Sequence, residues 1–383
     1  MSWQQRINSS LSTQRYNNRW RKRCIIDKNN TRLIRKGKKN YINFSSNDYL
    51  GLNQHPLIVN SWKKGIDLMG TGSGSSSHII GFSCFHSNLE IQLANWLGYS
   101  RAILFISGFD VNQAVINLLT KKYDHIIADK LIHASLLDAA IRSPAKLYRF
   151  RHNMIESLNF FLQYLCRGEI LVLTEGIFSM DGDTAPLKNI YEKTRKNNSW
   201  LLVDDAHGIG ITGAEGRGSC WLQGVKPNLL TISFSKAFGI GGAALLCDEN
   251  TADYFLQFSK NLIYSTCMPP AQAFALQCAL HLVQKSESLR DRLNENINYF
   301  KKGMKSISWK LIESSSAIQP LMIEDDNEAQ LVLTKLAKAG CWVNVIKPPT
   351  VPLGTTRIRI TLTAAHKFED IDILLEALHE TNH

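Results

Sequence analysis

Residues 200–210 read WLLVDDAHGIG, an apolar run that ends in two carboxylates and is followed by a histidine and two glycines. The apolar part has the length of a buried strand, and its continuous hydrophobicity is typical of a parallel sheet covered on both faces. The pattern predicts a strand at 200–203. Because ligands bind at the carboxyl ends of strands in open α/β sheets, its polar end is a candidate ligand site.

Similar apolar runs lie on both sides of this strand and alternate with helical patterns. The expected strands cover residues 102–106, 125–128, 169–174, 200–203, 229–234 and 243–247. Helical stretches are expected at residues 111–120, 135–141 and 188–197. This alternation predicts an α/β fold with a mostly parallel sheet between two layers of helices.

After about residue 285 the pattern changes to a smaller α+β arrangement. Helices are expected at residues 286–307, 327–339 and 369–379, and strands at residues 309–313, 318–323, 342–346 and 357–362. Residues 347–354 (KPPTVPLG) contain too many prolines for a strand, so we expect a rigid loop. The predicted domains are 1–45 with an N-terminal helix and short strands, 46–285 as the large domain, and 286–383.

The composition is that of an ordinary globular protein, with 383 residues of which 44% are hydrophobic and 20% charged. The formal net charge of +11 is compatible with a nucleic-acid ligand, a phosphate-bearing substrate or a solvated basic surface. We favour the last, because the basic residues are dispersed apart from residues 19–23 and 35–39.

The eight cysteines form no CxxC pair, and most stand in apolar surroundings. They indicate reduced core thiols, with no disulfide framework and no metal site. The cysteines are Cys24, Cys84, Cys166, Cys220, Cys247, Cys267, Cys278 and Cys341.

Two strand ends carry residues suited to a pyridine cofactor. Asp204 is either a helix cap or the partner of a pyridine nitrogen, whose protonated form it would stabilise, and His207 could reach the ring oxygen. Lys236, in TISFSKAFG (231–239), lies between an apolar strand and a glycine-rich stretch. Burial there would lower the pKa of its amine and make it a Schiff-base nucleophile.

Other polar residues follow neighbouring strands. Gly108 turns the chain into a helix, whose N-terminus could bind a phosphate, and Ser233 offers a hydroxyl to the same group. Asp110 would repel a phosphate, so we expect it to point away. Ser179 lies in a polar loop, and His133 is either a helix cap or a ring that stacks on the cofactor.

The small-residue stretch 70–77 (GTGSGSSS) has two interpretations. It is either a flexible linker or a place where the backbone approaches a ligand or a subunit closely.

With these residues in place, the whole chain resembles the α-oxoamine synthases, a family of fold-type I enzymes dependent on pyridoxal 5'-phosphate (PLP). The most specific stretches are 45–52 (SSNDYLGL), 97–109 (LGYSRAILFISGF), 174–183 (TEGIFSMDGD), 203–208 (VDDAHG), 217–222 (RGSCWL), 262–272 (LIYSTCMPPAQ) and 361–366 (TLTAAH). The resemblance implies a large domain with a seven-stranded, mostly parallel sheet and a smaller C-terminal α+β domain.

The resemblance also implies roles for individual residues. Lys236 would hold PLP as a Schiff base and act as the catalytic base, and three further residues would share the catalytic work: Asp204 at the ring nitrogen, His207 at the ring oxygen and His133 stacked on the ring. The remaining cofactor contacts would be Gly108, Phe109, Ser179, Ser233 and, from the 262–266 stretch of a neighbouring subunit, Thr266. Substrate contacts would be Arg21, Asn47, His133, Thr350 and Arg359.

The implied reaction is a decarboxylative condensation of an amino acid with an acyl thioester. Overall similarity favours L-alanine and a pimeloyl thioester, carried by CoA or a carrier protein, with 8-amino-7-oxononanoate, CO2 and free thiol as products in biotin biosynthesis. The resemblance implies a homodimer with shared sites. Family members without organellar targeting begin at a corresponding point, so we expect a cytoplasmic protein without a presequence.

The sequence leaves two alternatives to this reaction open. The chain could use glycine or serine with another acyl thioester, because the PLP chemistry is common to the family. It could also be a non-catalytic binding protein that retains the fold, although Lys236, Asp204 and His207 are all present.

Overall fold

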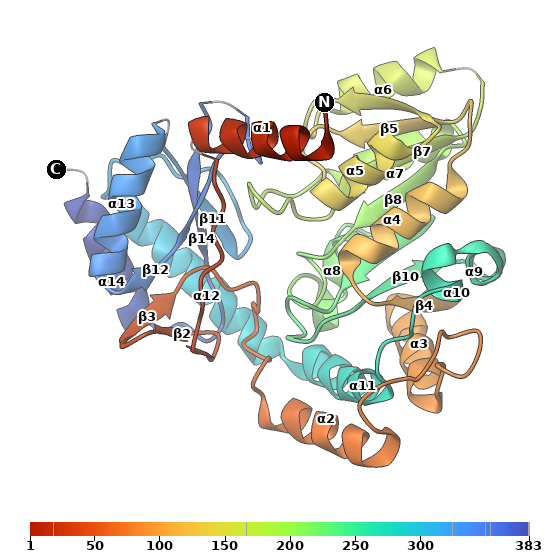
Figure 1. Ribbon diagram of the computed structural model, residues 1–383, viewed down its shortest axis with the longest axis horizontal. Coiled ribbons are helices and arrows are strands. Elements are labelled where there is room, and N and C mark those ends of the chain that lie inside the picture. The colour runs from red at the N-terminus through yellow and green to blue at the C-terminus, as the bar shows by residue number, and fades with distance from the viewer. Residues whose placement is uncertain (18, 166, 324, 349, 353, 382–383) are drawn as a thin grey trace.

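A computed structural model gives the structure of the chain (Figure 1). It describes residues 1–17, 19–165, 167–323, 325–348, 350–352 and 354–381. Within these residues a seven-stranded sheet has the order β4-β10-β9-β8-β7-β5-β6, and two smaller sheets have four and three strands.

The large sheet is mostly parallel, as predicted. Only β10 runs against its neighbours β4 and β9, so the other six strands share one direction. The strands are β4 (Arg101–Phe105), β5 (His125–Asp129), β6 (Lys146–Phe150), β7 (Ile170–Glu175), β8 (Trp200–Asp204), β9 (Leu229–Ser233) and β10 (Ala243–Cys247). The six predicted strands are confirmed to within a residue at each end.

Helices cover both faces of this sheet, so apolar residues are buried on either side. In β8, Leu201 and Val203 belong to one core cluster and Leu202 to the other. One face is covered by α4 (Gly108–Leu119), α5 (Ala134–Arg142), α9 (Glu249–Phe258) and α10 (Lys260–Ile263). The other is covered by α3 (Cys84–Leu97), α6 (Ile155–Tyr164), α7 (Leu187–Lys196) and α11 (Pro270–Lys285), with α2 (Pro56–Met69) packed on α11.

Strand β6 was not predicted. Its sequence KLYRF mixes charged and apolar residues, and only Phe150 is fully buried. The strand pairs with β5 alone, at the edge of the sheet, where one side of its backbone needs no partner strand.

Segments from the two ends of the chain share the four-stranded sheet. β1 (Lys28–Asn29), β2 (Leu33–Lys36) and β3 (Lys39–Asn43) form antiparallel pairs, and β3 pairs in parallel with β12 (Cys341–Trp342). The Arg32 guanidinium also donates two hydrogen bonds, of 2.6 and 2.8 Å, to the buried Asp370 carboxylate. The N-terminal helix α1 (Trp3–Tyr16) precedes these strands and has no buried residue. The division at residues 45 and 285 stays a prediction.

The C-terminal region agrees with the expected elements except at residues 309–313 and at residues 342–346, where the single predicted strand is divided between the four-stranded and the three-stranded sheet. It contains α12 (Glu287–Met304), β11 (Ile318–Met322), α13 (Asp326–Lys338), β13 (Asn344–Ile346), β14 (Arg357–Thr361) and α14 (Phe368–Glu380). The strand predicted at residues 309–313 is wrong, because that segment makes only an isolated bridge between Leu311 and Leu321. Two short elements of the large domain complete the structure, the 3-10 helix η1 (Ala214–Gly216) and α8 (Gly218–Leu222).

The prediction that the cysteines are core thiols is confirmed for only some of them. Cys220, Cys247 and Cys341 are buried, whereas Cys24 and Cys84 are exposed. Cys84 is the first residue of α3, directly after the Ser83 cap. Cys166 lies outside the described residues, as do Pro349 and Leu353 of the predicted 347–354 loop. No helix among the described residues is long and apolar enough to cross a membrane.

A histidine between two aspartates ties the 176–186 loop to the sheet. His152 donates from Nδ1 to Asp129 at 2.8 Å and from Nε2 to Asp183 at 2.7 Å. Burial opposes the charged imidazole, but the hydrogen bonds and charges of the two aspartates outweigh it and raise the pKa of His152 to about 9. The charged ring therefore clamps the loop that carries Ser179.

Replacing His152 should lower stability in a pH-dependent way. Because its folded pKa lies above its unfolded value, its contribution is complete below about pH 6.5 and is lost as pH rises through about 9. We expect His152→Gln to lower the free energy of unfolding by on the order of 1–3 kcal/mol near pH 6, and by much less near pH 10. Urea unfolding at both pH values measures this difference.

The matched control is His125→Gln, because His125 bonds the backbone carbonyl of Arg167 and no carboxylate. That variant should show no comparable change between the two pH values. An equal loss of stability for His152→Gln at both pH values would contradict the charged clamp.

Candidate active site

The predicted site residues meet at one edge of the large sheet. Strands β7, β8 and β9 are in parallel register, with Glu175 opposite Asp204 and Asp204 opposite Thr231. Paired residues of parallel strands project to the same face, so residues far apart in sequence lie side by side at the strand ends. The edge therefore concentrates the polar groups that follow three separate strands.

Asp204 is buried but keeps spare capacity to accept hydrogen bonds. Its Oδ1 accepts from the backbone N–H of Ala206 at 3.0 Å, and its Oδ2 accepts from Asn112 Nδ2 at 2.7 Å. Asn112, on α4, is itself held by Thr231 at 3.1 Å. Each carboxylate oxygen can accept about two hydrogen bonds, so one further donor can approach either oxygen.

Lys236 follows β9 in a turn that leads to β10. The turn is closed by a 2.9 Å hydrogen bond from the N–H of Gly239 to the Lys236 carbonyl. Gly239 has φ +70°, and a Cβ there would lie 2.5 Å from the backbone N of Asn53, so only glycine fits. The turn thus brings Gly239, three residues after Lys236, against the loop that follows β3.

The Lys236 amine is an unusually good candidate nucleophile. Burial lowers its pKa below that of an ordinary lysine, although Asp204 and Glu175 oppose this shift, and Arg359 adds to it. No hydrogen bond or ion pair engages the amine within the part of the chain that the structure describes. A larger fraction of the amine is therefore uncharged and free to react.

His133 stands at the start of α5, where the structure confirms the predicted helix cap. Its Nδ1 bonds the Ser135 hydroxyl at 2.8 Å and receives the Ser135 N–H at 3.2 Å, which makes it the helix cap. Ser135 also accepts from Asn112 at 2.9 Å, so the histidine belongs to the network around Asp204. The ring remains exposed and can offer a face to a ligand.

His207 is buried and faces the N-terminal part of the chain. Its Nδ1 lies 2.5 Å from the Tyr49 hydroxyl. Burial lowers the pKa of His207 well below the usual histidine value, and the positive charges of Lys236 and Arg359 add to the effect. The imidazole is therefore neutral.

The N-terminus of α4 and two serines form a cradle for an anion. Ser107 caps the helix by accepting from the N–H of Asp110, and Ser233 and Ser235 hydroxyls lie 2.8 Å apart. A Cβ on Gly108 would lie 3.5 Å from Ser233, so the helix start and the serines are adjacent.

Asp110 is held by Asn261 Nδ2 at 2.5 Å. Phe109 beside the cradle is 51% exposed.

Arg359, on β14, brings the smaller C-terminal sheet to the same edge. It donates to the Ser179 carbonyl at 2.8 Å, to Thr361 Oγ1 at 3.0 Å and to Asn47 Oδ1 at 3.2 Å. A guanidinium has five N–H donors, of which these three hydrogen bonds use three. Ser179 is buried in the loop that the His152 clamp secures.

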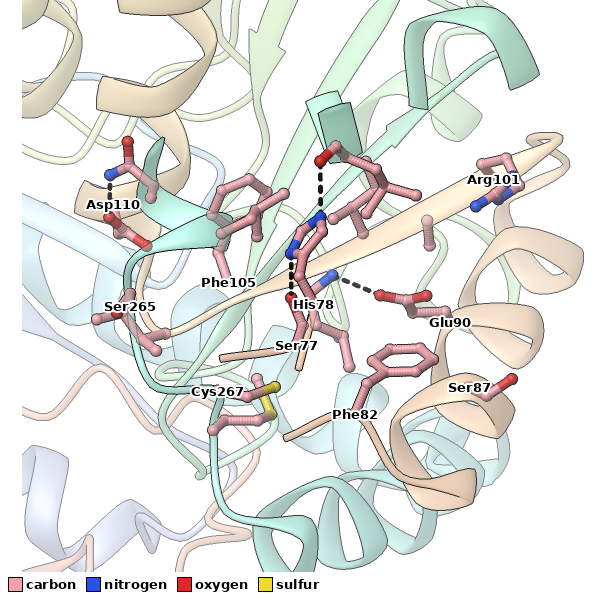
Figure 2. Close-up of a pocket in the computed structure, with 18 of the residues that line it drawn as sticks. Ser77, His78, Phe82, Ser87, Glu90, Arg101, Phe105, Asp110, Ser265 and Cys267 are labelled. Atoms are coloured by element: carbon pink, nitrogen blue, oxygen red, sulfur yellow. Dashed lines mark hydrogen bonds between the residues drawn. The ribbon is translucent and has the colours of Figure 1, made fainter. Parts of the chain in front are cut away.

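Three predicted residues lie outside this cluster. Arg21 is exposed in the coil after α1, and Thr350 is exposed in the 347–354 loop. Thr266 is exposed and lines a separate cavity of about 530 Å3, together with His78, Glu90 and Asp110 (Figure 2). Among the described residues, no hydrogen bond or ion pair joins these three to Lys236 or Asp204.

One buried acid of the site, Glu175, was not predicted from the sequence. Glu175 is fully buried at the end of β7, and its Oε1 has no hydrogen-bond partner among the described atoms. Burial and the neighbouring Asp204 raise its pKa well above the usual value, although Lys236 and the backbone N–H groups of His133 and Ser179 oppose this. Its position directly after an apolar strand, like that of Asp204, was the signal available.

Comparison with known proteins supports the fold and the family of this chain. The profile of the family described as aminotransferase class I and II matches residues 39–378. The 8-amino-7-oxononanoate synthase of Serratia proteamaculans (strain 568) is 53% identical over 382 residues, which cover 100% of both chains.

Two solved structures show the same architecture. A serine palmitoyltransferase variant from S. paucimobilis with a bound PLP–myriocin aldimine superposes with a TM-score of 0.94 at 26% identity, covering 100% of this chain and 98% of that one. An 8-amino-7-oxononanoate synthase from Francisella tularensis gives a TM-score of 0.79 at 29% identity, covering 89% of this chain and 97% of that one.

These likenesses confirm the predicted fold class, that of the fold-type I PLP-dependent transferases. The chain belongs to the class I and II aminotransferase family and, within it, to the family of the 8-amino-7-oxononanoate synthases.

Proposed function

We propose that this chain is a PLP-dependent acyltransferase that condenses L-alanine with a pimeloyl thioester. The thioester is carried by CoA or a carrier protein, and the products are 8-amino-7-oxononanoate, CO2 and free thiol in biotin biosynthesis. Full-length relatives named for this product support the proposal. The observation that carries it is the Lys236 amine, with its lowered pKa, beside the buried Asp204.

The residues at the sheet edge fit PLP. Asp204 has room for a ring N–H, because each of its oxygens accepts only one hydrogen bond from the described chain. The exposed ring of His133 offers a stacking face. The N-terminus of α4, with Gly108 and Ser233, offers N–H and hydroxyl donors to a phosphate. These residues, together with Phe109, Ser179 and His207, would hold the cofactor.

When bound, PLP supplies an electron sink for the charge that develops at the α-carbon of the amino acid. The Asp204 carboxylate favours a proton on the ring nitrogen by opposite-charge attraction. Lys236 would hold the cofactor through Nζ and, when its amine is free, would take up the α-proton of alanine as general base. Its lowered pKa keeps the amine able to accept that proton near neutral pH.

Arg359 and Asn47 bind and orient the carboxylate of alanine. The planar guanidinium of Arg359 suits a carboxylate, and Asn47 accepts from Arg359 through Oδ1, which leaves its Nδ2 to donate. Arg21 and Thr350 are the proposed contacts of the acyl substrate, and both are exposed to an incoming ligand.

We include a homodimer with shared sites in this proposal. Thr266 is exposed beside the cavity of Figure 2, where a second subunit could bring its phosphate cradle. Ile79, Ile80 and Tyr264 are 73%, 75% and 80% exposed, which is costly for large apolar side chains in water. We also propose a cytoplasmic location, supported by the free thiols of all seven cysteines that the structure describes.

A panel of substrates tests the reaction. Purified protein reconstituted with PLP should turn over L-alanine with pimeloyl-CoA, or with the pimeloyl carrier protein, far faster than glycine or serine with other acyl thioesters. Thiol release and product mass measure this. A clear preference for glycine would overturn the substrate assignment and leave the PLP chemistry standing.

Removing the reactive amine tests the role of Lys236. Lys236→Ala should lose the visible absorbance band of covalently held PLP and reduce kcat by at least about a thousand-fold, because both the covalent link and the general base are gone. Absorbance spectra and steady-state rates measure the two effects. A variant that retained the band or most of its activity would refute the assignment.

Paired substitutions of two buried acids test which one carries the charge. Asp204→Asn should reduce kcat by about 100- to 1000-fold, since the ring nitrogen loses its anionic partner. Glu175→Gln should cost much less, because the raised pKa of Glu175 already keeps that group neutral. Similar losses in both variants would show that Glu175 also acts as an anion.

A further inference from the structure

We infer that Tyr49 is a positioning residue that fixes the tautomer of His207, with the proton on Nε2 and the lone pair on Nδ1. The importance of this tautomer rests on the proposed function, in which His207 faces the ring oxygen of PLP. Tyr49 lies in the SSNDYLGL stretch (45–52), 158 residues before the histidine.

The contact between the two side chains is short and enclosed. The Tyr49 hydroxyl lies 2.5 Å from His207 Nδ1, and the ring centroids are 6.0 Å apart at 50°. Tyr49 is 1% exposed and His207 6% exposed, so water does not compete for the hydrogen bond. A hydrogen bond in such surroundings has a strong influence on the groups it joins.

Only one assignment of the protons satisfies both groups well. If Tyr49 donates to Nδ1, its oxygen and the histidine nitrogen are both satisfied at 2.5 Å. If Nδ1–H donates instead, the tyrosine proton must turn to Asn47 Oδ1, which is 3.5 Å away and already accepts from Arg359. The first arrangement is the stronger, since hydroxyl hydrogen bonds are normally below about 3.0 Å.

The charges around the pair keep both groups neutral. Burial lowers the pKa of His207, and the three groups that face it, Lys236, Arg359 and His133, lower it further. Burial raises the pKa of Tyr49 to about 12, although Arg359 opposes this shift. A neutral imidazole carries one N–H and a neutral tyrosine donates one, so a proton accepted at Nδ1 excludes a second N–H there.

The surrounding chain holds Tyr49 in place independently of His207. Asp48 accepts from the backbone N–H groups of Leu52 at 2.9 Å and Asn53 at 3.1 Å, which closes the turn that contains Tyr49. The Tyr49 carbonyl accepts from the N–H of Ala364 at 2.8 Å. The hydroxyl is therefore presented by a fixed backbone, as a positioning group requires.

Within the described residues, Nε2 of His207 has no hydrogen-bond partner, so it is the nitrogen left for a ligand. With a proton on Nε2, His207 can donate to an anionic ring oxygen. With the other tautomer, a lone pair would face that oxygen and repel it. Tyr49 thus decides whether His207 stabilises or opposes the bound cofactor.

Nitrogen-15 NMR of histidine-labelled full-length protein tests the tautomer directly, before and after PLP is added. The wild type should show His207 protonated at Nε2 alone, with the resonance assigned by its loss in His207→Asn. In Tyr49→Phe, the same resonances should move toward a mixture of the two tautomers in the cofactor-free protein. A wild-type signal with the proton at Nδ1, or an unchanged signal in Tyr49→Phe, would overturn the inference.

The loaded enzyme supplies a second readout. Tyr49→Phe should retain the PLP band but move its pH midpoint upward, since a weaker donor leaves more negative charge on the ring oxygen to hold the nearby proton. kcat should fall about 10-fold, as for other residues that orient a catalytic histidine, with KM for alanine little changed. The control is Tyr99→Phe, which removes a hydroxyl that bonds the Pro227 carbonyl at 3.1 Å, and should leave the midpoint in place.

A double-mutant cycle separates positioning from a general structural role. If Tyr49 acts through His207, Tyr49→Phe should change kcat less than about two-fold in the His207→Asn background. Additive losses would refute the inference. If the wild type itself formed no PLP band, the proposed function would fail. If the wild type formed a normal band and Tyr49→Phe had the same band and pH midpoint, only the role of Tyr49 would be refuted.

Discussion

Parallel pairing of β7, β8 and β9 is the constraint on which the rest of the site depends. Because the strands run in one direction and in register, their carboxyl ends are level, and Glu175, Asp204 and the chain after Ser233 emerge at one edge. Hydrophobic residues on both faces fix that register, since a slip of one residue would exchange the two buried faces. The chemistry is thus positioned by the same apolar pattern that stabilises the sheet.

Several acids lie close together at this edge, where their negative charges would repel one another. Their surroundings differ, and so do the shifts in their pKa values. Burial raises the pKa of Glu175 well above the usual value and that of Asp205 to about 7. Asp204 alone receives a side-chain amide, from Asn112, in addition to a backbone N–H. Environments that separate the protonation of neighbouring acids are a recurring way of assigning their roles. Here the two hydrogen bonds distinguish Asp204, the proposed partner of a pyridine nitrogen, from the neighbouring acids.

Local sequence predicted this edge well, because a buried strand followed by a polar residue is visible within a few positions. Asp204, Lys236 and Ser233 were found in that way. The pairing of Tyr49 with His207 was not, since it joins segments 158 residues apart and its apolar neighbours make Tyr49 look like a core residue. The strand predicted at 309–313 failed for a related reason: its residues WKLIE suit a strand, but the fold gives the segment only one bridge to β11. Strand β6 was likewise not predicted, because an edge strand pairs on one side only and its sequence can include charged residues.

Residues from both ends of the chain join those of the large sheet in the candidate site. Asn47 and Tyr49 come from the loop after β3, and Arg359 comes from β14, while the backbone N–H of Thr361 bonds the Phe44 carbonyl at 2.8 Å and joins the two segments. The side chains proposed to bind the substrate carboxylate are thereby joined to the segment that carries Tyr49. Asn47, which accepts from Arg359 at 3.2 Å, stands two residues before Tyr49, whose hydroxyl lies 2.5 Å from His207 Nδ1. The proposed carboxylate contacts and the proposed positioning of His207 therefore depend on one short segment of the chain.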